Sequence, residues 1–375
     1  MGFVNHSIRK AALNGLYFSG ISRLLRPVAA GVGAIIVLHR VKPCHSTRFQ
    51  PSLPLEVTPE FLEETIGHLT RNAYEFVSMD EARSRLLNRD FRTRFATVTL
   101  DDAYRDNMVW AKPIFAKHGV PYTIYVPTTF ADGVGNLWWL TLESIVANND
   151  RLEFDDCAIS CGSTTDKVRA YDRLKKIMLS QPSPAEEQAF VQRLAERYNY
   201  DHHAAARATC MNWDELRQLA ADPLATIGAH TVSHVVLSKL PENKVREELM
   251  QSRRILEREL ERDIRHLAYP YGGKNGVGKR EFRIAAEVGY WTAVTTRLGV
   301  LQSDDGSRLQ ELPRINIDGR YQRQRYFNVL LSGVAPAIWS AWRGFFPAPR
   351  ARAPGTASTS PIGGAQETRI YDARH

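Results

Sequence analysis

Short apolar runs that alternate with helical segments constrain the fold of this 375-residue chain more than any other feature. The run at 33–39 is apolar up to a terminal histidine, and the run at 95–101 contains only apolar residues and threonines up to a terminal aspartate. Runs of this kind are typical of strands that are buried on both faces of a parallel sheet. Between them, Thr58 followed by Pro59 is a helix-start signal. The alternation predicts βαβ units around a parallel sheet, and a chain of this length can form one large α/β domain.

The alternation of strand-like and helix-like segments changes at several points, and these changes predict the domain organisation. We expect an amphipathic helix within residues 1–30 and an α/β domain over 31–320. Within that domain, helical stretches replace strand signals over 130–212 and predict a helical insertion. A C-terminal helix is expected over 321–346. The last residues, 347–375, are rich in Pro, Ala, Gly and Ser, which predicts a disordered tail.

Charge and the two ends of the chain limit its partners. The formal net charge of +8 favours anionic partners. No dense Lys/Arg run with interleaved aromatic residues occurs, so nucleic-acid binding is not expected. Polar and charged residues interrupt the apolar runs of the first thirty residues, and Gly333, Pro336 and Arg343 interrupt the apolar segment 327–346. We therefore expect no signal peptide and no membrane-spanning helix, a cytoplasmic location, and terminal helices that either pack on the domain or rest peripherally on the inner face of the membrane.

Residues with metal-binding chemistry follow two of the predicted strands. Asp101 and Asp102 end one apolar run, and His230 and His234 follow another at 225–230. In α/β folds the carboxyl ends of the strands form the active site, and imidazole is a common ligand of divalent metals. Taken alone, the Asp pair is equally typical of a turn, and either histidine could be an ordinary surface or core residue. Taken together, Asp102, His230 and His234 describe a catalytic metal centre with open coordination positions.

Three motifs carry a resemblance to a known family. Thr99-Leu-Asp-Asp-Ala-Tyr104 resembles the Thr-Phe-Asp-Asp-Gly-Tyr motif of the NodB-type polysaccharide deacetylases, carbohydrate esterase family four. His230-Thr-Val-Ser-His234 is similar to the family's His-Ser/Thr-x-x-His motif, and Leu267-Ala-Tyr-Pro-Tyr-Gly272 is similar to its Arg-x-Pro-Tyr motif. The motifs occur in the family's order, and the resemblance extends over about residues 33–317.

The resemblance implies a distorted, TIM-like (β/α) barrel of about seven strands that deacetylates an acetylated polysaccharide or oligosaccharide. It implies a divalent metal, often zinc, with cobalt or another divalent ion as alternatives. By motif matching, Asp101 would be the general base, Asp102, His230 and His234 the metal ligands, and the backbone N–H of Tyr271 part of the oxyanion hole. A chitooligosaccharide and a bacterial exopolysaccharide are both open as substrates, as are N-acetyl and O-acetyl groups.

The sequence departs from the family pattern at three places. Ala103 replaces the glycine of the first motif, which strains the backbone if that position has a positive φ. The arginine of the third motif and the late Leu-x-His, which supplies the general acid, are absent. Because the first and last strands of a closed barrel are neighbours, His39 is our candidate for the acid, with His266 as its competitor. Arg314 is the candidate for the missing arginine beside the base.

Two other classes of function agree with parts of the sequence pattern. The departures favour a non-catalytic glycan-binding module on the same barrel, but the retained Asp-Asp and His-x-x-x-His set argues against it. A phosphohydrolase with an aspartate nucleophile usually needs Asp-x-Asp, and the sequence Asp101-Asp102-Ala103 lacks that spacing.

Overall fold

The computed structural model describes residues 6–44, 47–154 and 157–345. The chain divides into two compact units, Met1–Ile338 and Trp339–His375. Of the second unit only the end of helix α15 (Val334–Phe345) falls within the described residues. The predicted disordered tail, 347–375, lies outside them.

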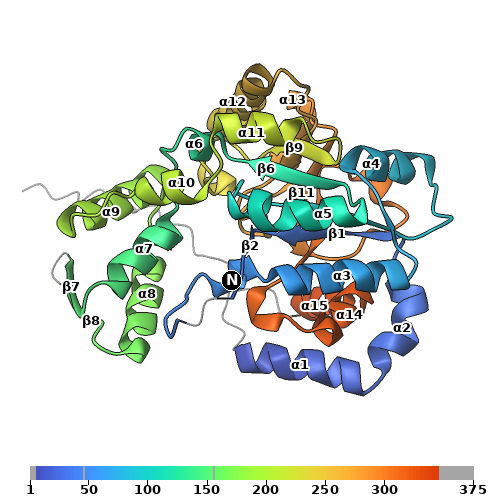
Figure 1. Ribbon diagram of the computed structural model, residues 1–375, viewed down its shortest axis with the longest axis horizontal. Helices are drawn as coiled ribbons and strands as arrows, with labels where there is room; N and C mark the ends of the chain where they lie inside the picture. The colour runs from blue at the N-terminus through green and yellow to red at the C-terminus, as the bar shows by residue number, and fades with distance from the viewer. Residues whose placement is uncertain (1–5, 45–46, 155–156, 346–375) are drawn as a thin grey trace, which may run out of the picture. The chain divides into compact units, whose positions relative to one another are not determined.

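A closed parallel barrel forms the centre of the first unit (Figure 1). Seven strands pair in the order β1-β12-β11-β10-β9-β6-β5, and β5 returns to β1 along six residue pairs from Gly33↔Phe95 to Leu38↔Leu100. A short eighth strand, β4, pairs with β5 at the outside. The expectation of a distorted barrel of about seven strands is confirmed. The strands are β1 (Gly33–Leu38), β4 (Glu75–Phe76), β5 (Phe95–Leu100), β6 (Tyr122–Val126), β9 (Ala225–Ala229), β10 (His266–Ala268), β11 (Thr292–Leu298) and β12 (Leu312–Asn316).

Helices connect the strands and begin and end where the sequence signals predict. Thr58 caps α3 by accepting a hydrogen bond from the N–H of Phe61, and Pro59 occupies the first helical position. Gly119 ends α5 in the left-handed conformation at φ 61°. The connecting helices are α3 (Pro59–Arg71), α4 (Met79–Asn88), α5 (Lys112–His118, preceded by a π-helical turn at Asn107–Ala111), α11 (Trp213–Ala220), α12 (Glu242–Leu260) and α13 (Lys279–Val288). Two-residue strands β2 (Arg40–Val41) and β3 (Glu56–Val57) pair beside the barrel.

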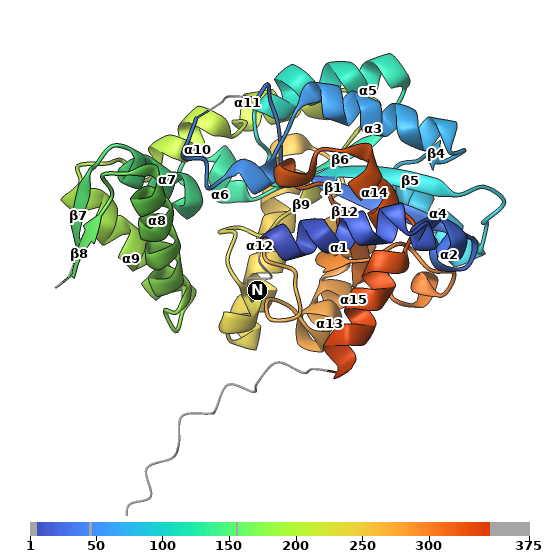
Figure 2. The ribbon, with the colours of Figure 1, turned by 90° about the horizontal axis from the view of Figure 1, so that it is seen from below.

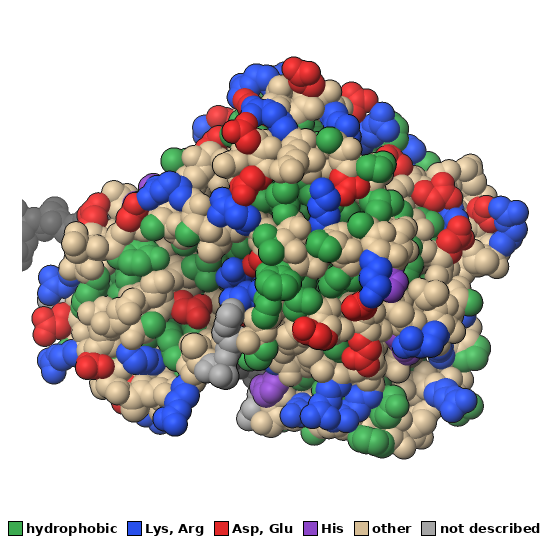
Figure 3. All heavy atoms as spheres, in the orientation of Figure 1, with side chains coloured by type: hydrophobic (Ala, Val, Ile, Leu, Met, Phe, Trp, Pro, Cys, Tyr) green, Lys and Arg blue, Asp and Glu red, His purple; other side chains and the backbone are tan. Residues whose placement is uncertain are grey.

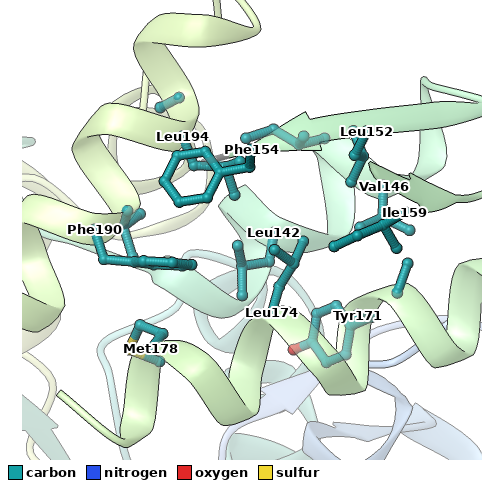
Figure 4. Close-up of a cluster of buried hydrophobic side chains, with 14 of the residues drawn as sticks. Leu142, Val146, Leu152, Phe154, Ile159, Tyr171, Leu174, Met178, Phe190 and Leu194 are labelled. Carbon is teal, nitrogen blue, oxygen red and sulfur yellow. The ribbon is translucent and has the colours of Figure 1, made fainter. Parts of the chain in front are cut away.

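The insertion between β6 and β9 forms a lobe beside the barrel (Figure 2). Its elements are α6 (Thr128–Ala131), α7 (Trp138–Ala147), β7 (Arg151–Phe154), β8 (Cys157–Ser160), α8 (Thr164–Leu179), α9 (Pro184–Arg197) and α10 (Ala204–Thr209). The lobe has its own apolar core, which includes Leu142, Tyr171, Leu174 and Phe190 (Figure 4). Our interpretation of this segment as purely helical was incomplete, because β7 and β8 form an antiparallel hairpin. Strands of four residues are too short for alternation to identify them reliably.

Each predicted terminal helix is two helices. The first ends at a break around Gly20, which has φ 74° and separates α1 (His6–Phe18) from α2 (Ile21–Ala29). The second is broken at Gly333, φ 75°, between α14 (Gln324–Leu331) and α15. Glycine is the residue that adopts this left-handed conformation without steric cost. No helix of the described ranges is long and apolar enough to cross a membrane.

Candidate active site

The predicted site residues meet at the carboxyl end of the barrel. Asp101 and Asp102 directly follow β5, and His230 directly follows β9. Tyr271 lies in the loop after β10, and His39 follows β1. Because all the barrel strands are parallel, residues that follow different strands arrive at the same rim, as the sequence predicted.

The backbone of the motif segments is strained. Asp102, Ala103, Thr231, His234 and Tyr271 all have positive φ, at 70°, 50°, 66°, 53° and 50°. Each such residue costs of order 1–3 kcal/mol, and such strain concentrates at functional sites. Ala103 therefore adopts a conformation that glycine adopts more easily, and it does so fully buried.

Asp102, His230 and His234 can hold one metal ion. Asp102 Oδ1 lies 3.2 Å from His234 Nε2 and 3.6 Å from His230 Nε2. Two ligand atoms bound at about 2.1 Å to a tetrahedral ion lie about 3.4 Å apart, which fits both distances. Asp102 Oδ1 is buried and accepts no hydrogen bond from the described residues. One carboxylate and two imidazoles, with an oxygen that lacks a donor, are a suitable set of ligands for a divalent metal.

A backbone carbonyl orients His230. Its Nδ1 lies 2.7 Å from the carbonyl oxygen of Ala268 and donates to it, which leaves Nε2 with its lone pair toward Asp102. Burial lowers the pKa of His230 to about 4, although Asp101 opposes the shift. The imidazole is therefore neutral near pH 7, as a metal ligand must be.

Asp101 forms a buried, bidentate ion pair with Arg314. Arg314 Nη1 and Nη2 each lie 2.7 Å from one carboxylate oxygen of Asp101, and both side chains are almost completely buried. Arg314 also donates from Nε to the carbonyl oxygen of Thr295. Burial raises the pKa of Asp101, but the charge of Arg314 and its hydrogen bonds to the carboxylate outweigh burial and hold the pKa well below its ordinary value. Asp101 is thus ionised near neutral pH and held in one orientation.

His39 lies beside Asp101, whereas His266 lies at the other end of the barrel. The parallel pairing of Leu38 with Leu100 places the residues that follow them, His39 and Asp101, next to each other. His266 is the first residue of β10 and bonds there to Thr292 and Asp80. The structure therefore removes His266 as a competitor for the acid.

A match to a protein-family model identifies the family of this chain. The family model described as "Polysaccharide deacetylase" matches residues 88–292, more than half of the chain. The chain belongs to the polysaccharide deacetylase family. It is thus a hydrolase, a carbohydrate deacetylase.

Solved structures of other deacetylases share the fold. They include deacetylase PplD of Streptococcus pyogenes in complex with acetate (17% identity, TM-score 0.52, 79% of this chain and 97% of that chain). A de-N-acetylase of Aggregatibacter actinomycetemcomitans matches at 12% identity and TM-score 0.52, over 79% and 99% of the two chains. The polysaccharide deacetylase BC0361 of Bacillus cereus matches at 15% identity and TM-score 0.51, over 80% and 68%. No curated protein sequence matches significantly.

Two residues that position the deacetylase motifs were missed from the sequence. Glu248 on α12 accepts hydrogen bonds from the backbone N–H groups of Val232 and Ser233, between the two histidines. The Asn107 side chain donates to the carbonyl oxygen of His39 at 3.0 Å. Glu248 belongs to a helix rich in charged residues, so no sequence signal distinguishes it. Asn107, three residues after the first motif, could have been suspected from its position alone.

Aromatic side chains from the insertion and from the loop after β10 surround His234 in the candidate site. The rings of Phe130, Trp139 and Tyr271 have centroids 5.3, 5.5 and 5.1 Å from that of His234. Trp138 Nε1 donates to the hydroxyl oxygen of Tyr271 at 2.8 Å. The insertion thus contacts both the loop that contains His234 and the loop that contains Tyr271.

Proposed function

We propose that this chain is a metal-dependent deacetylase that removes N-acetyl or O-acetyl groups from a glycan such as a chitooligosaccharide or a bacterial exopolysaccharide. The observation that carries the proposal is the cluster of Asp102, His230 and His234 directly beside the Asp101–Arg314 pair. A binding module needs no ionised carboxylate fixed next to three metal ligands. Metal-assisted hydrolysis of an acetyl group uses both.

Zinc is the metal we favour, because two imidazoles and one carboxylate form a set that suits its usual four-coordinate sites. When bound, such an ion polarises the acetyl carbonyl and lowers the pKa of water. Asp102, His230 and His234 would hold it. Cobalt or another divalent ion could replace zinc at the same ligands.

We assign the remaining steps to residues around the ligands. Asp101 accepts a proton from the attacking water, and Arg314 keeps Asp101 ionised and oriented. The N–H of Tyr271 donates to the oxygen that becomes negative when the acetyl carbon becomes tetrahedral, an interaction worth roughly 3–4 kcal/mol per donor. His39 donates a proton to the departing amine as the C–N bond breaks, so that an N-acetylated sugar yields acetate and a free amino sugar.

Acetate release from a panel of acetylated glycans, with and without added zinc or cobalt, tests the function. We expect release that depends on the metal and is strongest for one class of glycan. Glycan binding without acetate release under any metal condition would favour the non-catalytic module. Phosphate release from phosphorylated sugars would favour a phosphohydrolase.

His39→Gln is expected to lower turnover at least about a hundredfold while bound metal stays nearly unchanged, because a positioned acid contributes about 10²–10⁴-fold. Turnover is measured as acetate release, and metal content by elemental analysis. His118→Gln is the control, because His118 is exposed on α5 and contacts Glu63. Near-normal turnover of His39→Gln would remove His39 from the mechanism and point to water as the acid.

We further propose that the insertion, 130–212, borders the substrate cleft and limits access to it. Trp138→Phe removes the hydrogen bond to Tyr271 but keeps an aromatic ring. Loss of a hydrogen bond that contributes about 1 kcal/mol should lower kcat/KM for the preferred glycan about fivefold. Tyr271→Phe should have a similar effect, and the double variant should add little to either. Additive effects, or none, would indicate that the insertion only stabilises the side of the barrel.

A further inference from the structure

Helix α2 presents an apolar stripe to solvent. Ile21, Leu24, Leu25 and Val28 follow the spacing i, i+3, i+4, i+7 and so lie along one side of the helix. We call these four residues the outer stripe. All four are exposed, Leu24 to 77% and Val28 to 87%. A surface helix of a globular protein normally turns such a stripe inward.

The rest of the protein fixes this orientation. Ser22, on another side of α2, is buried, and so is Ala30 directly after the helix. Arg26 Nη1 donates to Asn72 Oδ1 of the α3 region at 2.9 Å. The small and polar side of α2 is therefore packed and bonded, and the outer stripe is held away from the core.

Helix α1 extends the apolar surface. Ile8, Tyr17 and Phe18 are exposed, Phe18 to 71%, and Leu13 alone among the residues of α1 is buried. Of the 15 large apolar side chains that are exposed among the described residues, seven lie between residues 8 and 28. Single exposed apolar residues are ordinary, but a concentration of this kind marks an interaction surface.

The charged residues of α1 and α2 themselves have one sign, and Asp318 is an acidic side chain that pairs with Arg9 of α1. The first acidic residue of the whole chain is Glu56, and seven Lys and Arg residues precede it. Lys10 on α1 and Arg23 on α2 are exposed. In Figure 3, Lys and Arg side chains lie next to apolar ones along the lower edge, where Figure 1 places α1 and α2. Basic residues beside an exposed apolar stripe are typical of helices that lie in the interface of an anionic bilayer.

We propose that α1 and α2 dock this protein on an anionic lipid bilayer. The outer stripe enters the boundary between headgroups and acyl chains, and Lys10 and Arg23 contact the lipid phosphates. A second copy of the chain fits this surface less well, because a symmetric contact would bring two cationic faces together without an acidic residue on either helix. The inference is independent of the chemistry proposed for the barrel.

Flotation of the full chain with vesicles tests the proposal. One set of vesicles contains phosphatidylcholine alone, and the other contains added phosphatidylglycerol. We expect the protein to float with the anionic set only, and less so at high salt. Lys10→Gln and Arg23→Gln should each weaken binding about fivefold. The double variant Leu24→Glu, Val28→Glu should weaken it at least about tenfold, because two inserted apolar groups become charged.

A matched double variant controls for surface charge. Leu87→Glu, Val168→Glu alters two apolar residues that are each 47% exposed elsewhere, and it should float like the unmodified protein. Thermal unfolding should be similar for all variants, because the altered side chains are exposed. Absence of flotation of the unmodified protein, or equal flotation of the Leu24, Val28 variant, would overturn the proposal. The proposal would also be overturned if the unmodified protein formed concentration-dependent dimers and bound no vesicles, and if the Leu24, Val28 variant no longer formed these dimers.

Discussion

Asp102→Asn and His230→Gln are each expected to lower the metal content from about one ion per chain to near zero and to reduce acetate release at least about a thousandfold. Both changes keep a side chain of similar size. Asp102→Asn removes the negative charge of the ligand oxygen, and His230→Gln removes the imidazole nitrogen that offers a lone pair. A bound metal supplies several kcal/mol of stabilisation to developing charge, and each 1.36 kcal/mol is a factor of ten in rate. A chelator should have the same effect on the unmodified enzyme, and added zinc should reverse it.

Asp106→Asn is the control for metal binding. Asp106 lies four residues after Asp102, but its carboxylate is bonded to Arg40 and the N–H of Val41. We expect this variant to retain the metal. Full metal content in Asp102→Asn or His230→Gln would show that the ion is held elsewhere, and it would remove the basis of the proposed mechanism.

Arg314→Met is expected to lower the free energy of unfolding by about 3–5 kcal/mol, because it leaves the buried carboxylate of Asp101 without a partner. Burial raises the pKa of Asp101 and the guanidinium lowers it, so we expect the pKa of Asp101 to rise when the guanidinium is removed. Asp101→Asn should be destabilising for the reciprocal reason, since it leaves the buried guanidinium with a neutral partner. Denaturation by urea, with the metal content held equal, measures each change.

The double variant Asp101→Asn, Arg314→Met separates pairing from packing. It removes both charges, so its loss of stability should be smaller than the sum of the two single losses, with a coupling energy of a few kcal/mol. Additive losses would contradict a strong pair. Acetate release should fall in all three variants, because each disturbs the candidate base.

Much of the barrel and the candidate site could be predicted because parallel strands have a simple geometry. Apolar runs that end in Asp101 and just before His230 indicate both a buried strand and the point where it opens at the rim. Pairing of β1 with β12 and β5 closes the barrel and brings residues from both ends of the chain together. That closure explains why His39 and Arg314, chosen as replacements for absent motif residues, both lie near Asp101.

The features that could not be predicted depend on contacts between distant segments or on whether a residue begins or follows its strand. Glu248 supports the His-x-x-x-His loop from a helix that begins after it, and periodicity does not report such a contact. His39 and His266 are both next to strands, but one follows its strand and the other begins it, and only the strand boundaries distinguish the two ends. The break at Gly20 was missed because one glycine inside an amphipathic pattern is compatible with a continuous helix.

The closure of the barrel by its last strand also has a consequence for synthesis of the protein. Asp101 and Arg314 are separated by 213 residues. At about 5–20 residues per second, a ribosome needs roughly 10–40 s to supply the arginine after the aspartate. During that interval β1 lacks its β12 neighbour and the Asp101 carboxylate lacks Arg314, so burial of this region costs more free energy than in the complete chain. We therefore expect the growing protein to depend on chaperones until β12 emerges, and the metal ligands to acquire their final geometry only after release of nearly the whole chain.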